Sequence, residues 1–147
     1  MKIEHNNPWL FNNKEFTDDD VGDYAGFVYL ITNIITNEKY IGRKYFTSTR
    51  KLKKFKRRKT SASDWKTYWG SSDTLNAAIE KHGHENFKRE ILSLHVTKGD
   101  VNYQEVRYQF KFDILEKIGY YNENINGKWF RKPKHISDRR KLAESMT

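Results

Sequence analysis

The stretch GFVYLITNIITNEKYIG, residues 26–42, places a tyrosine in each of two runs of apolar and aromatic residues. The first run, residues 26–31, is rich in β-branched and aromatic side chains, as is typical of a buried strand. The residues between the runs include two asparagines, which are common in turns. The stretch therefore predicts a β-hairpin with a longer loop, with Tyr29 on one strand and Tyr40 on the other.

Three further elements are expected after the hairpin. Asp73 is a good N-cap residue, and apolar residues at helical spacing lead from it to Gly83, which suits the position just after a helix. Residues 87–94 alternate in polarity well enough to form a third strand. The apolar positions of residues 102–118 step by three or four, which indicates an amphipathic helix. Together these elements predict an α+β fold.

The length of 147 residues suits one compact domain. Residues 1–25 are polar and acidic apart from a short aromatic patch, and we expect an irregular N-terminal extension that packs its aromatic side chains on the domain edge. Residues 26–126 would form the domain itself. Residues 127–147 would be a basic, partly irregular C-terminal tail.

The charge is unevenly distributed along the chain. The formal net charge is +9, yet residues 1–42 carry only 3 basic side chains against 7 acidic ones. Residues 43–147 carry 25 basic and 12 acidic side chains, and residues 43–59 hold ten basic side chains and no acidic one. A basic surface of this kind favours a polyanionic partner, most often nucleic acid. The alternative is that the positive charge serves only to keep the protein soluble.

The chain has no cysteine, which excludes disulfides and thiolate zinc sites. Any metal ion would be held by oxygen or histidine ligands, which points to magnesium or manganese. No apolar run approaches the roughly 18 residues of a membrane span, and the N-terminus lacks a signal-peptide pattern. We therefore expect a cytoplasmic protein that does not contact a membrane.

The hairpin resembles the one that defines the GIY-YIG nucleases, in which two tyrosine-bearing strands open a small α/β domain. The YIG triplet is intact at residues 40–42, whereas Phe-Val-Tyr replaces the GIY triplet. The stretch SSDTLNAAIEKHGHENFKREIL, residues 71–92, resembles the central helix and third strand of the family. Residues 119–122, Gly-Tyr-Tyr-Asn, resemble its closing element. The similarity implies a small central three-stranded antiparallel sheet flanked by helices, and is strongest to small phage-encoded members.

The resemblance also implies a metal-dependent DNA endonuclease that hydrolyses phosphodiester bonds. Glu105, in the setting NYQEVRYQF, matches the metal-binding glutamate of the family and would hold Mg²⁺ or Mn²⁺. Tyr29 would act as the base that takes the proton of the attacking water, and Tyr40 would form a hydrogen bond nearby. Gly42 and Asn122 would support the site. Taken without the resemblance, the tyrosines are ordinary strand residues and the glutamate an ordinary helix residue.

The family places an essential arginine on a helix after the YIG triplet. Arg50 lies at about the right distance from Gly42 and is ranked first, with Arg57 close behind and Arg58 a further alternative. Other basic residues near the site are expected to contact DNA phosphates without reading sequence. The full set of predicted nucleic-acid contacts is Arg43, Lys44, Lys53, Lys54, Arg57 and Arg58.

Three functions remain open on the sequence. The first is the endonuclease, in a homing-like or other DNA-processing role. The second is an inactive nucleic-acid-binding module on the same fold, and the third is an interaction protein whose basic face binds an acidic partner. Because only about twenty residues follow the predicted domain, we expect weak sequence preference, or a homodimer or protein partner that supplies specificity.

Overall fold

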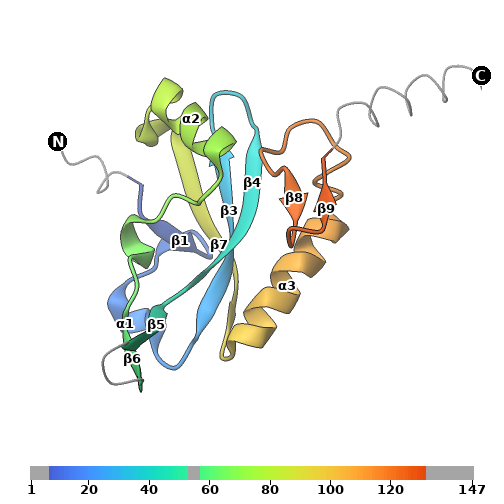
Figure 1. The fold of residues 1–147 in the computed structure, drawn as a ribbon. Coiled ribbons are helices and arrows are strands. Elements are labelled where there is room, and N and C mark those ends of the chain that lie inside the picture. Colours follow the sequence, from blue (N-terminus) through green and yellow to red (C-terminus); the bar gives the residue numbers. More distant parts are fainter. Residues whose placement is uncertain (1–6, 53–56, 132–147) are drawn as a thin grey trace, which may run out of the picture.

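The computed structural model describes residues 7–52 and 57–131, and at 49–52 and 57–60 it describes the backbone alone (Figure 1). The predicted hairpin is present and longer than expected. Strand β3 (Gly26–Asn33) pairs antiparallel with β4 (Lys39–Tyr45), and Tyr29 lies opposite Gly42. The predicted third strand, β7 (Phe87–His95), pairs antiparallel with the other side of β3.

The sheet is larger than the three antiparallel strands that were expected. It has five strands in the order β2-β1-β7-β3-β4. Strand β1 (Trp9–Phe11) runs parallel to β7, so the sheet is mixed, and β2 (Lys14–Glu15) closes that edge. The opposite edge is β4, which carries the YIG triplet.

The expectation of an irregular N-terminal leader is therefore wrong for residues 9–15. Trp9 is only 1% exposed and packs against the rings of Phe27 and Tyr29. Its indole N–H donates to the carbonyl of Trp65 at 2.6 Å. Two short β-strands are hard to recognise in sequence, and the strand that joins β1 to the sheet lies some eighty residues away along the chain.

Side chains alternate between the two faces of β3, so the strand contributes to two separate cores. Phe27, Tyr29 and Ile31 face a large aromatic core that also contains Leu75 and Ile79 of helix α2 (Asp73–His82). Val28 faces a smaller core on the other side, which includes Ile114 and is covered by helix α3 (Lys98–Lys111). Successive strand residues point to opposite faces, so the two helices lie on opposite sides of the sheet (Figure 1).

The helices differ from the prediction mainly at their ends. Ser72, not Asp73, is the N-cap of α2, and its side chain accepts from the Leu75 amide at 3.2 Å. Helix α3 begins four residues earlier than expected, after the N-cap Thr97, and ends at Lys111. Ile114 and Ile118 therefore lie beyond the helix, in turns. The shorter elements are α1 (Asp18–Val21), η2 (Trp65–Thr67), η3 (His84–Asn86), β8 (Asn124–Ile125) and β9 (Trp129–Phe130).

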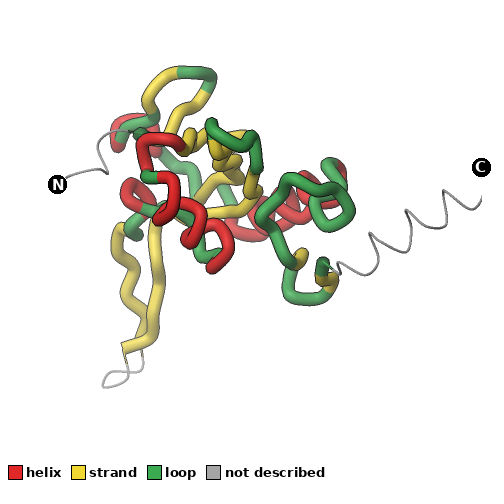
Figure 2. Tube along the Cα trace, turned by 90° about the horizontal axis from the view of Figure 1, so that it is seen from above, coloured by secondary structure: helices red, strands yellow, loops and turns green. Residues whose placement is uncertain are grey.

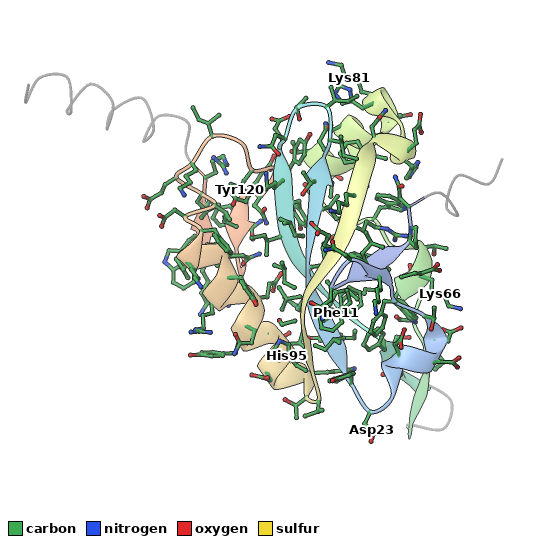
Figure 3. The ribbon with its side chains drawn as sticks, turned by 180° about the vertical axis from the view of Figure 1, so that it is seen from behind. Phe11, Asp23, Lys66, Lys81, His95 and Tyr120 are labelled. Atoms are coloured by element: carbon green, nitrogen blue, oxygen red, sulfur yellow. The ribbon has the colours of Figure 1, made fainter. Side chains whose placement is uncertain are left out.

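The segment after α3 covers part of the edge of β4. The Lys39 amide donates to the Gly119 carbonyl at 2.8 Å. The Lys39 carbonyl in turn accepts from the Tyr121 amide at 2.7 Å. Tyr120 lies beside the strand between these two bonds (Figure 3). The Asn122 side chain then bonds both backbone groups of Ile41, at 3.0 Å and 2.8 Å. An exposed strand edge is a liability that proteins cover, and here the cover reaches Ile41.

No helix other than the single turn η2 is described between Gly42 and Gly70, contrary to the expected arginine-bearing helix. Strands β5 (Thr47–Leu52) and β6 (Arg57–Ala62) instead form an antiparallel ribbon, which we call the arm. The arm projects from the body of the domain (Figure 2). Among the described residues, no helix is long and apolar enough to cross a membrane.

The buried position of Trp9 gives a prediction about the N-terminal strands. Trp9→Ala should lower the free energy of unfolding by about 3–5 kcal/mol, because removal of a large side chain leaves a cavity in the aromatic core. Urea denaturation would measure the change. Trp129, on β9, is 48% exposed and is the matched control, whose change to alanine should cost less than about 1 kcal/mol. Equal effects of the two substitutions would show that β1 is not part of the core.

Candidate active site

The two tyrosines of the hairpin lie on one face of the sheet, at its β4 edge. Their rings are 6.2 Å apart between centroids and tilted by 33°. Gly42 lies between them: a Cβ there would be 2.5 Å from the Tyr29 hydroxyl and 2.9 Å from the Tyr40 ring. Only a residue without a side chain leaves room for the Tyr29 hydroxyl, which explains the glycine of the YIG triplet.

Gly70 and Tyr68 enclose the tyrosine pair from the segment before α2. Gly70 has a φ of +93°, and a Cβ on it would lie 3.5 Å from the Tyr29 hydroxyl. Burial raises the pKa of the Tyr29 phenol well above its usual value of 10, and the phenols of Tyr40 and Tyr68 raise it further. Burial is also the main reason why the pKa of Tyr40 rises to about 12. Both phenols are therefore protonated at neutral pH and can donate hydrogen bonds.

Glu105 approaches the same edge from the opposite face of the sheet. Its Oε1 accepts from Nη1 of Arg43 at 2.6 Å, and its side chain is only 12% exposed. Nε2 of Gln109, one helical turn later, approaches Oε2 at 3.4 Å and also donates to the Ile41 carbonyl at 2.9 Å. Burial raises the pKa of Glu105, and Arg43 beside it opposes that rise.

A pocket of about 460 Å³ joins these groups across the edge of β4. A second pocket of about 430 Å³ adjoins it, and both are lined by Tyr40, Arg43, Ser71 and Glu105. The tyrosines come from β3 and β4, the carboxylate from α3 and the serine from the turn before α2. Since β4 is the last strand of the sheet, side chains from both faces can meet around it. The geometry thus combines phenols, one carboxylate and one arginine in a solvent-accessible space.

The other predicted basic residues have different positions. Lys44 lines the larger pocket, where its Nζ binds Asp64 at 2.6 Å and lies 4.0 Å from the Tyr68 ring centre. Arg50 lies on β5, and Arg57 and Arg58 lie on β6, so all three belong to the arm. Lys53 and Lys54 lie outside the described residues.

Sequence reasoning missed several groups of the site. Tyr68 and Ser71 line the pocket and Gly70 lies beside the Tyr29 hydroxyl, yet none of the three was assigned to the site. Gln109 could have been found, because it lies one helical turn after Glu105 and therefore on the same face of α3. Asn122 was predicted to support the site, and its side chain bonds both backbone groups of Ile41.

The donors present fit a hard divalent cation better than a structural metal. The described residues contain no cluster of three or more histidine, cysteine or carboxylate groups. Glu105 is the one carboxylate among the side chains that line the larger pocket. A single carboxylate suits Mg²⁺, which usually keeps several waters and takes phosphate oxygens from a substrate.

The contact between Gly42 and the tyrosines gives a second prediction. Gly42→Ala should destabilise the protein by about 1–3 kcal/mol, because the new methyl group must push aside the Tyr29 phenol or the Tyr40 ring. Chemical denaturation with near-ultraviolet circular dichroism would report both the stability and the tyrosine environment. Gly99→Ala is the matched control, because Gly99 lies on α3 with nothing within 4 Å, and it should be neutral or stabilising. A neutral Gly42→Ala would contradict the packing.

Comparison with known proteins assigns most of the chain to one family. The family model described as "Putative endonuclease segE, GIY-YIG domain" matches residues 9–125. No curated protein and no solved structure matched the chain. The match begins at Trp9, where the first strand of the sheet begins, and ends at Ile125, in the short strand β8. It contains the hairpin, both helices and the pocket, and the chain therefore belongs to the GIY-YIG nuclease family.

Proposed function

We propose that this protein is a metal-dependent DNA endonuclease that hydrolyses phosphodiester bonds in the pocket at the edge of β4. The observation that carries the proposal is the meeting of Tyr29, Tyr40, Arg43 and Glu105 around one pocket. These side chains come from both faces of the sheet, and a packed core would not need them together at a solvent-accessible edge. Membership of a nuclease family supports the same chemistry.

Each group has a role in hydrolysis. Glu105 would hold Mg²⁺ or Mn²⁺, and a bound divalent cation polarises the phosphate and stabilises the leaving oxygen. Tyr29 would take the proton of the attacking water, and Tyr40 would hold the water or a phosphate oxygen through its hydroxyl. Because burial raises the pKa of both phenols, the proton transfer needs a cation in the pocket to lower the pKa of Tyr29.

An arginine would neutralise charge on the scissile phosphate. Arg50 remains a candidate for this role, with Arg57 and Arg58 as alternatives, because the arm that carries them begins at the pocket. Thr47 and Ser48, at the base of β5, line that pocket. Arg43 is the described arginine whose side chain lines the pocket itself.

The arm would bind the DNA beside the cleaved bond. Residues 50–59 contain eight basic residues and no acidic one. In the register of the arm Arg50 lies opposite Lys59, and Lys51 lies opposite Arg58. A polyanion such as DNA would neutralise the positive charge of this segment. A six-residue strand spans about 20 Å, and the major groove of DNA accommodates a two-stranded ribbon.

The catalytic assignment predicts the outcome of a cleavage assay. Wild-type protein should nick or linearise plasmid DNA with Mg²⁺ and not with EDTA. Glu105→Gln and Tyr29→Phe should each slow cleavage by at least about a hundredfold, because each removes one group that acts in the reaction. Tyr24→Phe, on an exposed tyrosine outside the pocket, should cut at the wild-type rate. Full activity of both site variants would overturn the assignment, and an inactive wild type that still binds DNA would favour the inactive module.

The proposed role of the arm gives a prediction about DNA affinity and its dependence on salt. Replacing Arg50, Lys51, Arg58 and Lys59 by serine should weaken duplex binding in EDTA, measured by fluorescence anisotropy. It should also lower the slope of log affinity against log salt by about 0.9 for each phosphate that the variant no longer neutralises. The control replaces four exposed lysines on other parts of the domain, namely Lys14, Lys81, Lys111 and Lys117, and changes the net charge equally. Equal decreases in the two variants would mean that only the net charge matters.

A further inference from the structure

The ion pair between Arg43 and Glu105 occupies the place where hydrolysis needs a cation. We propose that Arg43 and a divalent cation compete for Glu105, and that the displaced guanidinium becomes the group that binds the scissile phosphate. The inference rests on the proposed function, and it selects Arg43 over the arginines of the arm.

Glu105 needs a positive partner in the metal-free protein. Its side chain is 12% exposed, and a carboxylate in such a place is costly unless it is paired. Oε1 is bound by Arg43 at 2.6 Å, while among the described side chains Oε2 has only the neutral amide of Gln109 at 3.4 Å. The guanidinium therefore supplies the charge that a metal ion would otherwise supply, and the two cations cannot share that oxygen without repelling each other.

Arg43 is placed so that it can leave this partner. It lies on β4 two residues after Ile41, where the hydrogen bonds of Asn122 end. Its side chain is 39% exposed and lines both pockets. The guanidinium also lies 5.8 Å from the centre of the Tyr45 ring. The exposure of the side chain and the pocket that it lines leave the guanidinium space to turn from Glu105 toward the tyrosines.

The guanidinium is also the cation near the site best suited to a phosphate. It offers parallel N–H donors that match two phosphate oxygens. Lys44 is already held by Asp64, and Lys98 lies over the Tyr45 ring at 4.8 Å. Arg89 is buried and donates to backbone carbonyls of Asn7 and Tyr68. Among the described arginines, Arg43 is the one that a metal ion on Glu105 would release into the pocket.

Metal binding without DNA tests the competition directly. Tb³⁺, a hard cation that prefers oxygen ligands, would be titrated into the protein while its luminescence is excited through the tyrosines of the pocket. Arg43→Gln should bind Tb³⁺ about tenfold more tightly than wild type, because the ion no longer displaces a charged hydrogen bond. Lys98→Gln is the matched control: it removes one positive charge from the same pocket without touching Glu105, and should change the affinity less than about threefold.

Cleavage by the same variants supplies the second readout. Arg43→Gln should cut plasmid DNA at least about a hundredfold more slowly than wild type, although it binds the metal more tightly. A purely structural ion pair would predict that both properties deteriorate together. Tb³⁺ affinity that rises no more in Arg43→Gln than in Lys98→Gln would overturn the competition. An undiminished cleavage rate in Arg43→Gln would overturn the phosphate role, and a wild type that binds Tb³⁺ but never cuts DNA would instead count against the proposed function.

A measurement on the wild-type protein covers the case in which Arg43→Gln does not fold. The Nε–H resonance of Arg43, identified by its disappearance in Arg43→Lys, should shift as Mg²⁺ is added, with the same midpoint as the backbone amides around Glu105. In Glu105→Gln the resonance should already be displaced and should not respond to Mg²⁺. If the resonance in wild-type protein did not shift at saturating Mg²⁺, the proposed competition between Arg43 and the cation for Glu105 would be overturned.

Discussion

The side chain of Asn122 bonds both backbone groups of Ile41, and the active-site geometry depends on this pair of hydrogen bonds. It closes the edge of β4 up to the residue before Gly42 and leaves the next residues of the strand open. The covering segment is held in turn by Arg131, whose guanidinium donates to the carbonyls of Asn122, Lys117, Ile114 and Tyr120. An edge strand that is half covered and half open can be rigid and still reach a substrate.

The site also depends on the two-sided nature of the sheet. Tyr29 is buried in the aromatic core, and its hydroxyl lies beside Gly42. Glu105 belongs to α3, on the other face, and meets the tyrosines only because β4 has no further strand beside it. The stable cores on both faces therefore fix the directions from which the proposed catalytic groups approach. Core side chains have few alternative rotamers, so the phenol is positioned at little cost in entropy on binding.

Charge in the pocket is balanced by neighbours of different kinds. Glu105 is neutralised by Arg43, and Lys44 by Asp64, while the tyrosines stay protonated because burial raises the pKa of each. In the register of the arm, Arg50 and Lys51 lie opposite Lys59 and Arg58. Two of the positive charges that line the pocket are thus paired with carboxylates, and residues 50–59 add eight basic residues with no acidic one. A polyanionic substrate is the partner that such a distribution favours.

The sequence by itself determined the hairpin, the order of the main helices and strands, and the family. These follow from local patterns, namely alternation in β3, helical spacing before Gly83 and the YIG triplet, whose glycine the packing of Tyr29 requires. Only the tertiary structure decided that Trp9 adds a parallel strand, that a ribbon replaces the expected helix, and that Arg43 binds Glu105. Each of these depends on a contact between residues distant in sequence or on a competition between helix and ribbon. Local propensity does not encode such contacts, because their energy comes from the partner that folding brings into place.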